Sequence, residues 1–155
     1  MTTYQTQLAQ VCALLNESGA QYVLVGARAL QLWGSSRATR DIDILIEPTT
    51  ENAARVLSAL SQIGFGVARE WLAEEVATKK VTIIGDTPRV DILTVAWSVH
   101  YREARPSATI FTVESVDIPT ISIEHLIASK RTGRLQDAAD IEVLEEIQRI
   151  RGEGR

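Results

Sequence analysis

The sequence contains few of the residues that tie a chain together or anchor it outside a folded core. Its single cysteine, Cys12, excludes an internal disulfide and is expected to be buried as a small apolar side chain. The two histidines, His100 and His125, have no spacing that suggests a zinc site. No apolar run approaches the roughly 20 residues that cross a bilayer, and the polar start of the chain differs from a secretory signal. These absences favour a cytoplasmic protein without a membrane segment.

What the sequence does contain is typical of a folded domain. Hydrophobic residues make up 45% of the 155 positions and charged residues 23%, and no repeat or flexible linker divides the chain. We therefore predict one domain over residues 1–155. The formal net charge of −4 gives no overall indication of nucleic-acid binding, yet basic residues gather at 28–40 and 130–134. A local positive pocket in an acidic protein favours a small phosphate-bearing ligand, and an RNA end remains open as a second substrate.

Hydrophobic spacing and turn residues predict alternating helices and strands. Helices are expected at 4–17, 27–33, about 49–62, 122–133 and about 135–149, and strands at 22–25, 42–46, 79–84, 89–95, 109–113 and 116–118. This order predicts an α/β (α+β) fold in which a small mixed β-sheet is flanked by helices, with a helical tail at about 122–150. Residues 67–77 are ambiguous, although Trp71 and Leu72 are expected to pack inward.

Two aspartates, Asp41 and Asp43, form the most informative feature of the chain. They flank Ile42 at the start of an apolar run, and because side chains alternate along a strand, both carboxylates point to the same face. Two adjacent carboxylates repel each other unless a cation lies between them, and Mg²⁺ is held in proteins by a few carboxylates together with substrate phosphates. The pattern therefore predicts a Mg²⁺ site, with a pair of ordinary acids on a solvent-exposed strand edge as the alternative.

Asp91 is a third acid, placed alone in the apolar run 90–93. A carboxylate in a buried strand needs a partner, so Asp91 is expected to face a cleft or an ion, with a solvent-exposed strand end as the alternative. If its strand lies beside that of Asp43, three carboxylates meet and can hold one or two Mg²⁺ ions. Gly26 ends a strand directly before a helix, where backbone N–H groups can approach a phosphate, although a glycine there is also ordinary turn chemistry.

Together these motifs resemble the nucleotidyltransferase superfamily related to DNA polymerase beta. The resemblance is carried by Gly26-Ala27, by the run 37–44 with its two aspartates, and by the run 90–93. The Arg-x-Thr-x-Asp-x-Asp form is more similar to the bacterial branch that contains the AbiEii-type toxins of abortive-infection and toxin–antitoxin systems. Positions in the tail agree with that branch, namely Ser129-Lys130, Gly133-Arg134, Asp137 and Asp140. The match covers about residues 20 to 142 and implies a nucleotidyltransferase-like fold.

The resemblance implies transfer of a nucleoside monophosphate from an NTP to an acceptor, with release of pyrophosphate and with Mg²⁺ held by three acids. Carried to this sequence, Asp41 and Asp43 would be metal ligands, and Asp91 the third ligand or the base for the acceptor hydroxyl. Lys130 would reach a phosphate or the acceptor, and Asp137 would orient Lys130 or contact the nucleotide. Such transfers are catalysed mainly by positioning and charge neutralisation.

The expected phosphate contacts include one departure from the family. Gly26 would lie against the triphosphate, but Ala27 stands where the family has Gly or Ser and supplies no hydroxyl. Arg28 is the candidate that could replace it with a charge. The remaining candidates for contacting the nucleotide and its phosphates are Arg37, Thr39, Arg40 and Arg134. For the arginines before Asp41 the alternative is pairing with the nearby aspartates, and for Thr39 a hydrogen bond within a turn.

We therefore predict a Mg²⁺-dependent nucleotidyltransferase that uses an NTP and acts on a tRNA end, a protein hydroxyl or a small molecule. A cognate partner protein, as in a toxin–antitoxin system, is part of this prediction. The alternative is a catalytically weak member of the fold that serves as a binding module or as one half of such a pair. Ala27 favours the alternative, and the intact set of three aspartates argues against it.

Overall fold

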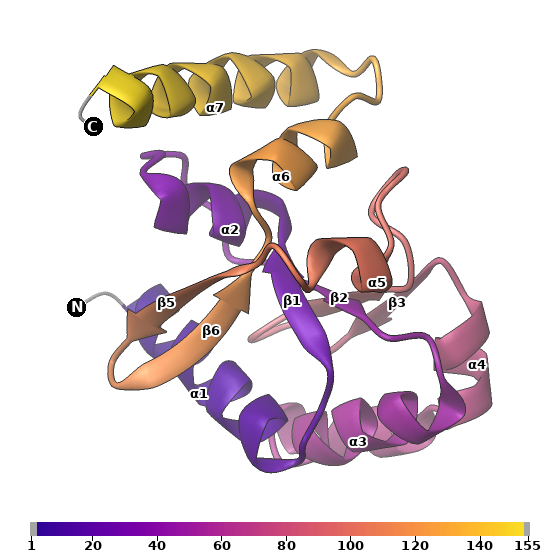
Figure 1. Cartoon of the computed structure of the whole chain (residues 1–155). Helices are drawn as coiled ribbons and strands as arrows, with labels where there is room; N and C mark the ends of the chain where they lie inside the picture. The colour runs from indigo at the N-terminus through magenta and orange to yellow at the C-terminus, as the bar shows by residue number, and fades with distance from the viewer. Residues whose placement is uncertain (1–2, 154–155) are drawn as a thin grey trace.

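The computed structural model describes residues 3–153, and its elements follow the order predicted from the sequence (Figure 1). The helices are α1 (Thr3–Glu17), α2 (Gly26–Trp33), α3 (Thr50–Leu60), α4 (Ala73–Thr78), α5 (Tyr101–Ala104), α6 (Ile123–Ser129) and α7 (Leu135–Glu153), with a 3₁₀ helix at Gly64–Glu70. The strands are β1 (Tyr22–Val25), β2 (Ile42–Ile46), β3 (Val81–Ile84), β4 (Val90–Leu93), β5 (Thr109–Val113) and β6 (Val116–Thr120).

Six strands form one mixed sheet in the order β3-β4-β2-β1-β6-β5. At its centre β1 lies antiparallel to β2 and parallel to β6, and β2 lies parallel to β4. The outer strands β3 and β5 are antiparallel to their neighbours. The predicted α/β fold with a small mixed sheet is therefore confirmed. The adjacency of β2 and β4, which are separated in the chain by α3, the 3₁₀ helix, α4 and β3, brings the acidic motifs together.

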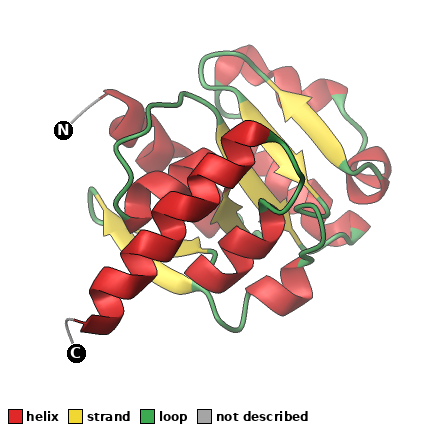
Figure 2. Ribbon diagram, turned by 90° about the horizontal axis from the view of Figure 1, so that it is seen from above, coloured by secondary structure: helices red, strands yellow, loops and turns green. Residues whose placement is uncertain are grey.

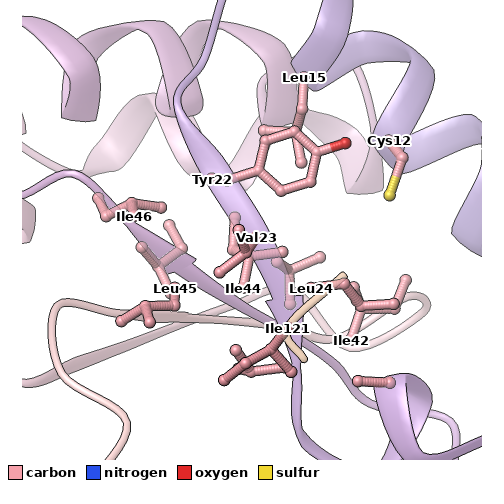
Figure 3. Packing of buried hydrophobic residues seen from close by; sticks show 14 of the residues in the cluster. Cys12, Leu15, Tyr22, Val23, Leu24, Ile42, Ile44, Leu45, Ile46 and Ile121 are labelled. Atoms are coloured by element: carbon pink, nitrogen blue, oxygen red, sulfur yellow. The ribbon is translucent and has the colours of Figure 1, made fainter. Parts of the chain in front are cut away.

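The core is built on the two central strands (Figure 3). All four side chains of β1 are buried, and β2 is buried throughout except at Asp43, which is half-buried. Continuous apolar runs of this kind fit strands that are covered on both faces. Cys12 and Leu15 of α1 pack against β1, so the burial expected for the cysteine is confirmed.

Helices cover the strands from two sides. In Figure 1, α1 and α3 lie below the sheet with α4 at the right beside α3, and α2, α6 and α7 lie above it, where β1 runs into α2. The long helix α7 crosses this upper side (Figure 2). The predicted helix caps are present, because the hydroxyl of Thr49 accepts a hydrogen bond from the backbone of Asn52 and that of Ser122 from the backbone of His125. The upper helices and the ends of the strands enclose the candidate site.

Two predicted details are wrong. Leu72 is 65% exposed rather than packed inward, because it lies in the short connection before α4, whereas Trp71 packs half-buried against the core. α6 ends at Ser129 and not at Gly133, since Lys130 already leaves helical geometry with a ψ of 4°.

No helix among residues 3–153 is long and apolar enough to cross a membrane.

Candidate active site

The three predicted acids lie together. β2 and β4 are parallel neighbours, and their register pairs Asp43 with Asp91, so the two side chains leave the sheet on the same face. Asp41 joins them in a pocket of about 320 Å³. The other residues that line this pocket are Val25, Gly26, Ala27, Arg37, Thr39, Leu93, Ala96, Trp97, Ser129, Lys130, Thr132, Arg134 and Asp137.

The charge on Asp43 is disfavoured by its surroundings. Its pKa is raised to about 7, first because the carboxyl group is buried and then because the charges of Asp91 and Asp41 lie close to it. A hydrogen bond with Asp91 raises the pKa further, and only Lys130 lowers it. Carboxylates that repel one another in this way form a site suited to a cation.

Gly26 allows the backbone to approach the acids closely. The end of β1 pairs with β2, where Val25 lies opposite Asp43, and the chain then enters α2. Gly26 has a φ of +68°, and a Cβ atom at this position would lie 2.1 Å from Oδ2 of Asp43. Only glycine combines this left-handed conformation with the absence of a side chain. The first turn of α2 therefore lies directly against the acidic pocket.

Replacing Gly26 by alanine tests this contact. We expect Gly26→Ala to displace the Asp43 carboxylate, to destabilise the fold and to abolish any activity of the pocket. Gly19→Ala is a matched control, because Gly19 has a similar φ of +73° but a Cβ atom added there would meet nothing within 4 Å. In the control, the free energy of unfolding measured in urea should fall by only about 1 kcal/mol, which is the cost of placing alanine in a left-handed conformation. Equal losses in the two variants would contradict the close approach.

Lys130 lines the same pocket and is held there by two aspartates of α7. Its Nζ lies 2.9 Å from Oδ2 of Asp140 and 3.8 Å from Oδ1 of Asp137. Asp140 also accepts a 2.5 Å hydrogen bond from Arg37, and Asp137 is bonded to Arg134. Lys130 and Asp140 are both buried. The three cations that line the pocket are thus each paired with an aspartate. Lys130 is buried, the side chain of Arg37 is partly exposed and that of Arg134 is largely exposed.

Arg89 holds the third acid of the trio. Its Nε and Nη2 donate to the two carboxylate oxygens of Asp91 at 2.8 and 3.1 Å, and Nε lies 3.9 Å from Asp41. These carboxylates raise the pKa of Arg89. Arg89 is not among the residues that line the pocket and lies beside it.

The residues present fit a divalent cation in part. Three carboxylates on one face supply the hard oxygen donors that Mg²⁺ prefers. The pKa of Asp43 is raised first by burial and then by the charges of the other two acids. In the part of the chain that the structure describes, however, no three acidic, histidine or cysteine side chains already stand as a complete ligand set. The donors therefore match the ion in chemistry, and the side chains would need to adjust to hold it.

The remaining predicted residues divide into two groups. Ala27, Thr39 and Arg134 line the pocket with Gly26 and Lys130. Arg28 is instead buried and borders a neighbouring hollow together with Gln31 and Ser35, and Arg40 is exposed beside Asp41. The structure does not bring these two arginines to the pocket, and Arg37 pairs with Asp140 rather than with the aspartates next to it in sequence.

Trp97 forms part of the pocket wall through an unusual turn. Reciprocal backbone hydrogen bonds between Ala96 and Val99 close the turn, and Trp97 takes a φ of +58° within it. A bulky residue rarely adopts this left-handed conformation, and such strain tends to occur where a side chain is held for function. The indole remains 61% exposed at the pocket.

Two contributors were not predicted in these roles. Asp140, and not Asp137, is the nearer partner of Lys130. Arg89 holds Asp91 although it was expected only to begin a strand. The sequence carried a signal for Arg89, because a residue two positions before Asp91 on a strand shares its face. For Asp140, the Asp-x-x-Asp spacing places Asp137 and Asp140 on the same side of one helix. It does not indicate which of the two lies closer to Lys130.

A comparison with known families decides the assignment of the chain. A sequence model of the aminoglycoside-2''-adenylyltransferase family matches residues 7–144, which is most of the chain. The chain belongs to this family. Aminoglycoside-2''-adenylyltransferases are nucleotidyltransferases by name, so the predicted superfamily is confirmed at that level. No protein of curated function matches the chain. The finer resemblance to the AbiEii-type branch is not confirmed by this match and stays a prediction.

Proposed function

We propose that the protein is a Mg²⁺-dependent nucleotidyltransferase that transfers AMP from ATP to a hydroxyl group and releases pyrophosphate. The observation that carries this proposal is the register of β2 and β4, which sets Asp43 beside Asp91 at the pocket that Gly26 and Lys130 also line. The family name supports ATP as the nucleotide. Catalysis of this kind needs positioned charges more than covalent chemistry, and both carboxylates and paired cations line the pocket.

The proposed roles follow from these positions. Asp41, Asp43 and Asp91 would hold Mg²⁺, which when bound neutralises phosphate charge and polarises the reacting phosphoryl group. Lys130, Arg37 and Arg134 would bind the triphosphate, and the backbone N–H groups at the start of α2 would approach it beside Gly26.

In the reaction, the acceptor oxygen forms a bond to the α-phosphorus of ATP. The bond from that phosphorus to the oxygen of the β-phosphate breaks, and pyrophosphate leaves with the bonding pair. The hydroxyl proton passes to Asp91 or to water. Asp91 is suited to this step because its side chain lines the pocket on β4, next to Leu93, Ala96 and Trp97.

A small hydroxyl-bearing molecule is the acceptor that we propose to test first. The family name includes aminoglycosides, and a pocket of about 320 Å³ has the size of a small-molecule site. Trp97 offers a flat face on which the ring of the acceptor or the base of the nucleotide can stack. A tRNA end and a protein hydroxyl are tested in the same experiment.

The test follows the radioactive label from ATP. The protein with Mg²⁺ is incubated with kanamycin, total RNA or a cell extract, and with ATP labelled at the α- or the γ-phosphate. We expect label transfer from the α-phosphate only, and loss of transfer in Asp41→Asn. Transfer of the γ-label would indicate a kinase and contradict the proposal. Asp86→Asn, an exposed acid in the turn between β3 and β4, is the control.

A second function is favoured by two observations. Ala27 supplies no hydroxyl to a phosphate, and Arg89 already forms an ion pair with Asp91 where a metal ion would otherwise balance its charge. A protein that binds ATP without turnover and acts with a partner chain, as in a toxin–antitoxin pair, would retain the fold and lose the reaction. ATP binding without label transfer to any acceptor supports this second function.

A further inference from the structure

Arg89 is a charged residue at the acidic trio that the proposed reaction does not use. Its planar fork donates two hydrogen bonds to one carboxylate, with Nε at 2.8 Å and Nη2 at 3.1 Å from the two oxygens of Asp91. The side chain of Asp91 is 15% exposed, and that of Arg89 is 39% exposed. Two parallel bonds from a rigid guanidinium fix the plane of a carboxylate, which a single bond from lysine cannot do.

The position of Arg89 leaves Asp91 available to the pocket. Asp91 lines the pocket, whereas Arg89 is not among its lining residues and lies beside it, with Nε 3.9 Å from Asp41. A carboxylate has about four lone-pair sites on its two oxygens, and the fork takes one on each. Of the remaining sites, one is used by the hydrogen bond with Asp43, and the other can accept a ligand. The carboxylates of metal sites are commonly held in this way by a hydrogen-bond donor behind them.

The charges around the three aspartates also support a positioning role for Arg89. Asp43 and Asp91 are adjacent in the register, and Asp41 is close to Asp43. Lys130 also lies near Asp43, but it is already paired with Asp140. Arg89 contacts two of the three acids, with Nε 3.9 Å from Asp41 as well as bonded to Asp91. It therefore reduces the repulsion that would otherwise turn Asp91 away from Asp43.

We propose that Arg89 is a positioning residue, which orients the Asp91 carboxylate toward the pocket so that Asp91 can serve beside Asp43 as a ligand of the divalent ion. This proposal rests on the proposed function. It concerns a residue that does not line the pocket. It states that the geometry of the guanidinium group, in addition to its charge, affects the affinity for the ion.

Arg89→Lys separates geometry from charge. The variant keeps the positive charge and loses the fork, so Coulomb repulsion of the ion is the same as in the wild type. We expect Mn²⁺, used as a spectroscopic substitute for Mg²⁺, to bind Arg89→Lys about tenfold more weakly, as is typical when outer contacts of metal ligands are lost. The measurement is electron paramagnetic resonance of free Mn²⁺ in the presence of an ATP analogue with a methylene bridge between the α- and β-phosphates. Arg55→Lys on the exposed face of α3 is the control.

A chemical rescue excludes a merely structural effect. Arg89→Ala should regain part of its Mn²⁺ affinity when millimolar guanidinium is added, and ammonium at the same concentration should not restore it. Mn²⁺ binding in Arg89→Lys that is equal to or tighter than in the wild type would overturn the positioning role of Arg89 but not the proposed function. It would mean that the charge at position 89, or its competition with the ion for Asp91, determines the affinity. Absence of Mn²⁺ binding in the wild type would overturn the proposed function and this role with it.

Discussion

Asp43→Asn is expected to abolish nucleotide transfer and to stabilise the protein without metal above neutral pH. Loss of transfer should exceed about 100-fold, since even the outer contacts of metal ligands cost 10- to 100-fold. The gain in stability has a separate cause. Asp43 is half-buried beside Asp91 and Asp41, so its negative charge is less favourable in the folded chain than in the unfolded chain. Asparagine keeps the shape and removes that charge.

The pH dependence of this gain follows from the raised pKa. The carboxyl of Asp43 titrates with a pKa of about 7 in the folded protein, against 3.8 for the ordinary group. Between these values the folded chain binds the proton that the unfolded chain has released, so the free energy of unfolding falls as pH rises and levels off above 7. One pKa unit corresponds to about 1.4 kcal/mol, so the full difference is of order a few kcal/mol.

Urea unfolding of the wild type and Asp43→Asn in the presence of EDTA measures this effect. The two proteins should differ little near pH 4, and the variant should be more stable by about 2–4 kcal/mol at pH 8. Asp86→Asn, the exposed control, should not change the pH profile. A variant that is less stable than the wild type at pH 8 would show that the carboxylate is satisfied in the folded state, against the repulsion described above.

The second large effect is expected at Asp140. This residue is 3% exposed and bonds to the buried Lys130 and to Arg37. Asp140→Ala leaves the ammonium of Lys130 buried with only the more distant Asp137 as a partner. Removing one member of a buried ion pair typically costs about 3–5 kcal/mol. We expect a loss of about 3 kcal/mol in urea unfolding, together with loss of transfer because Lys130 is no longer held at the pocket.

A double variant separates stability from function at this pair. Lys130→Met with Asp140→Leu replaces both charges by apolar groups of similar size, which is often neutral for stability. The side chain of Arg37 is 37% exposed and can be solvated. The double variant should therefore recover most of the lost stability and remain inactive. Recovery of transfer would contradict the proposed role of Lys130 at the phosphates, and failure to recover stability would indicate that Asp140 stabilises the fold by other contacts.

The local elements of this protein could be predicted because their signals lie within short stretches of sequence. The four apolar residues of β1 and the alternation around Asp41 and Asp43 each fix a strand without reference to the rest of the chain. Leu72 was misplaced because an apolar residue in a connection has no periodic context. The end of α6 was misplaced because a glycine stop was assumed where the helix unwinds earlier, at Lys130.

The site could be predicted only in part, because it depends on pairing between distant segments. Three acids in separate motifs suggested a common site. From the sequence, their meeting could be predicted only on the condition that β4 pairs with β2, which the structure shows. Pairings of long side chains were less accessible still. Nothing in the spacing indicated that Arg37 would contact Asp140 across most of the chain, or that Arg28 would be buried away from the pocket. Such contacts are set by the packing of helices on the sheet.

The position of a bound metal ion tests the central claim most directly. Crystals grown with Mn²⁺ and the methylene-bridged ATP analogue would show the ion by its anomalous scattering. The peak should lie within coordination distance of carboxylate oxygens of Asp41 and Asp43, with an Asp91 oxygen facing it. A peak elsewhere, or a nucleotide bound outside this pocket, would contradict the account.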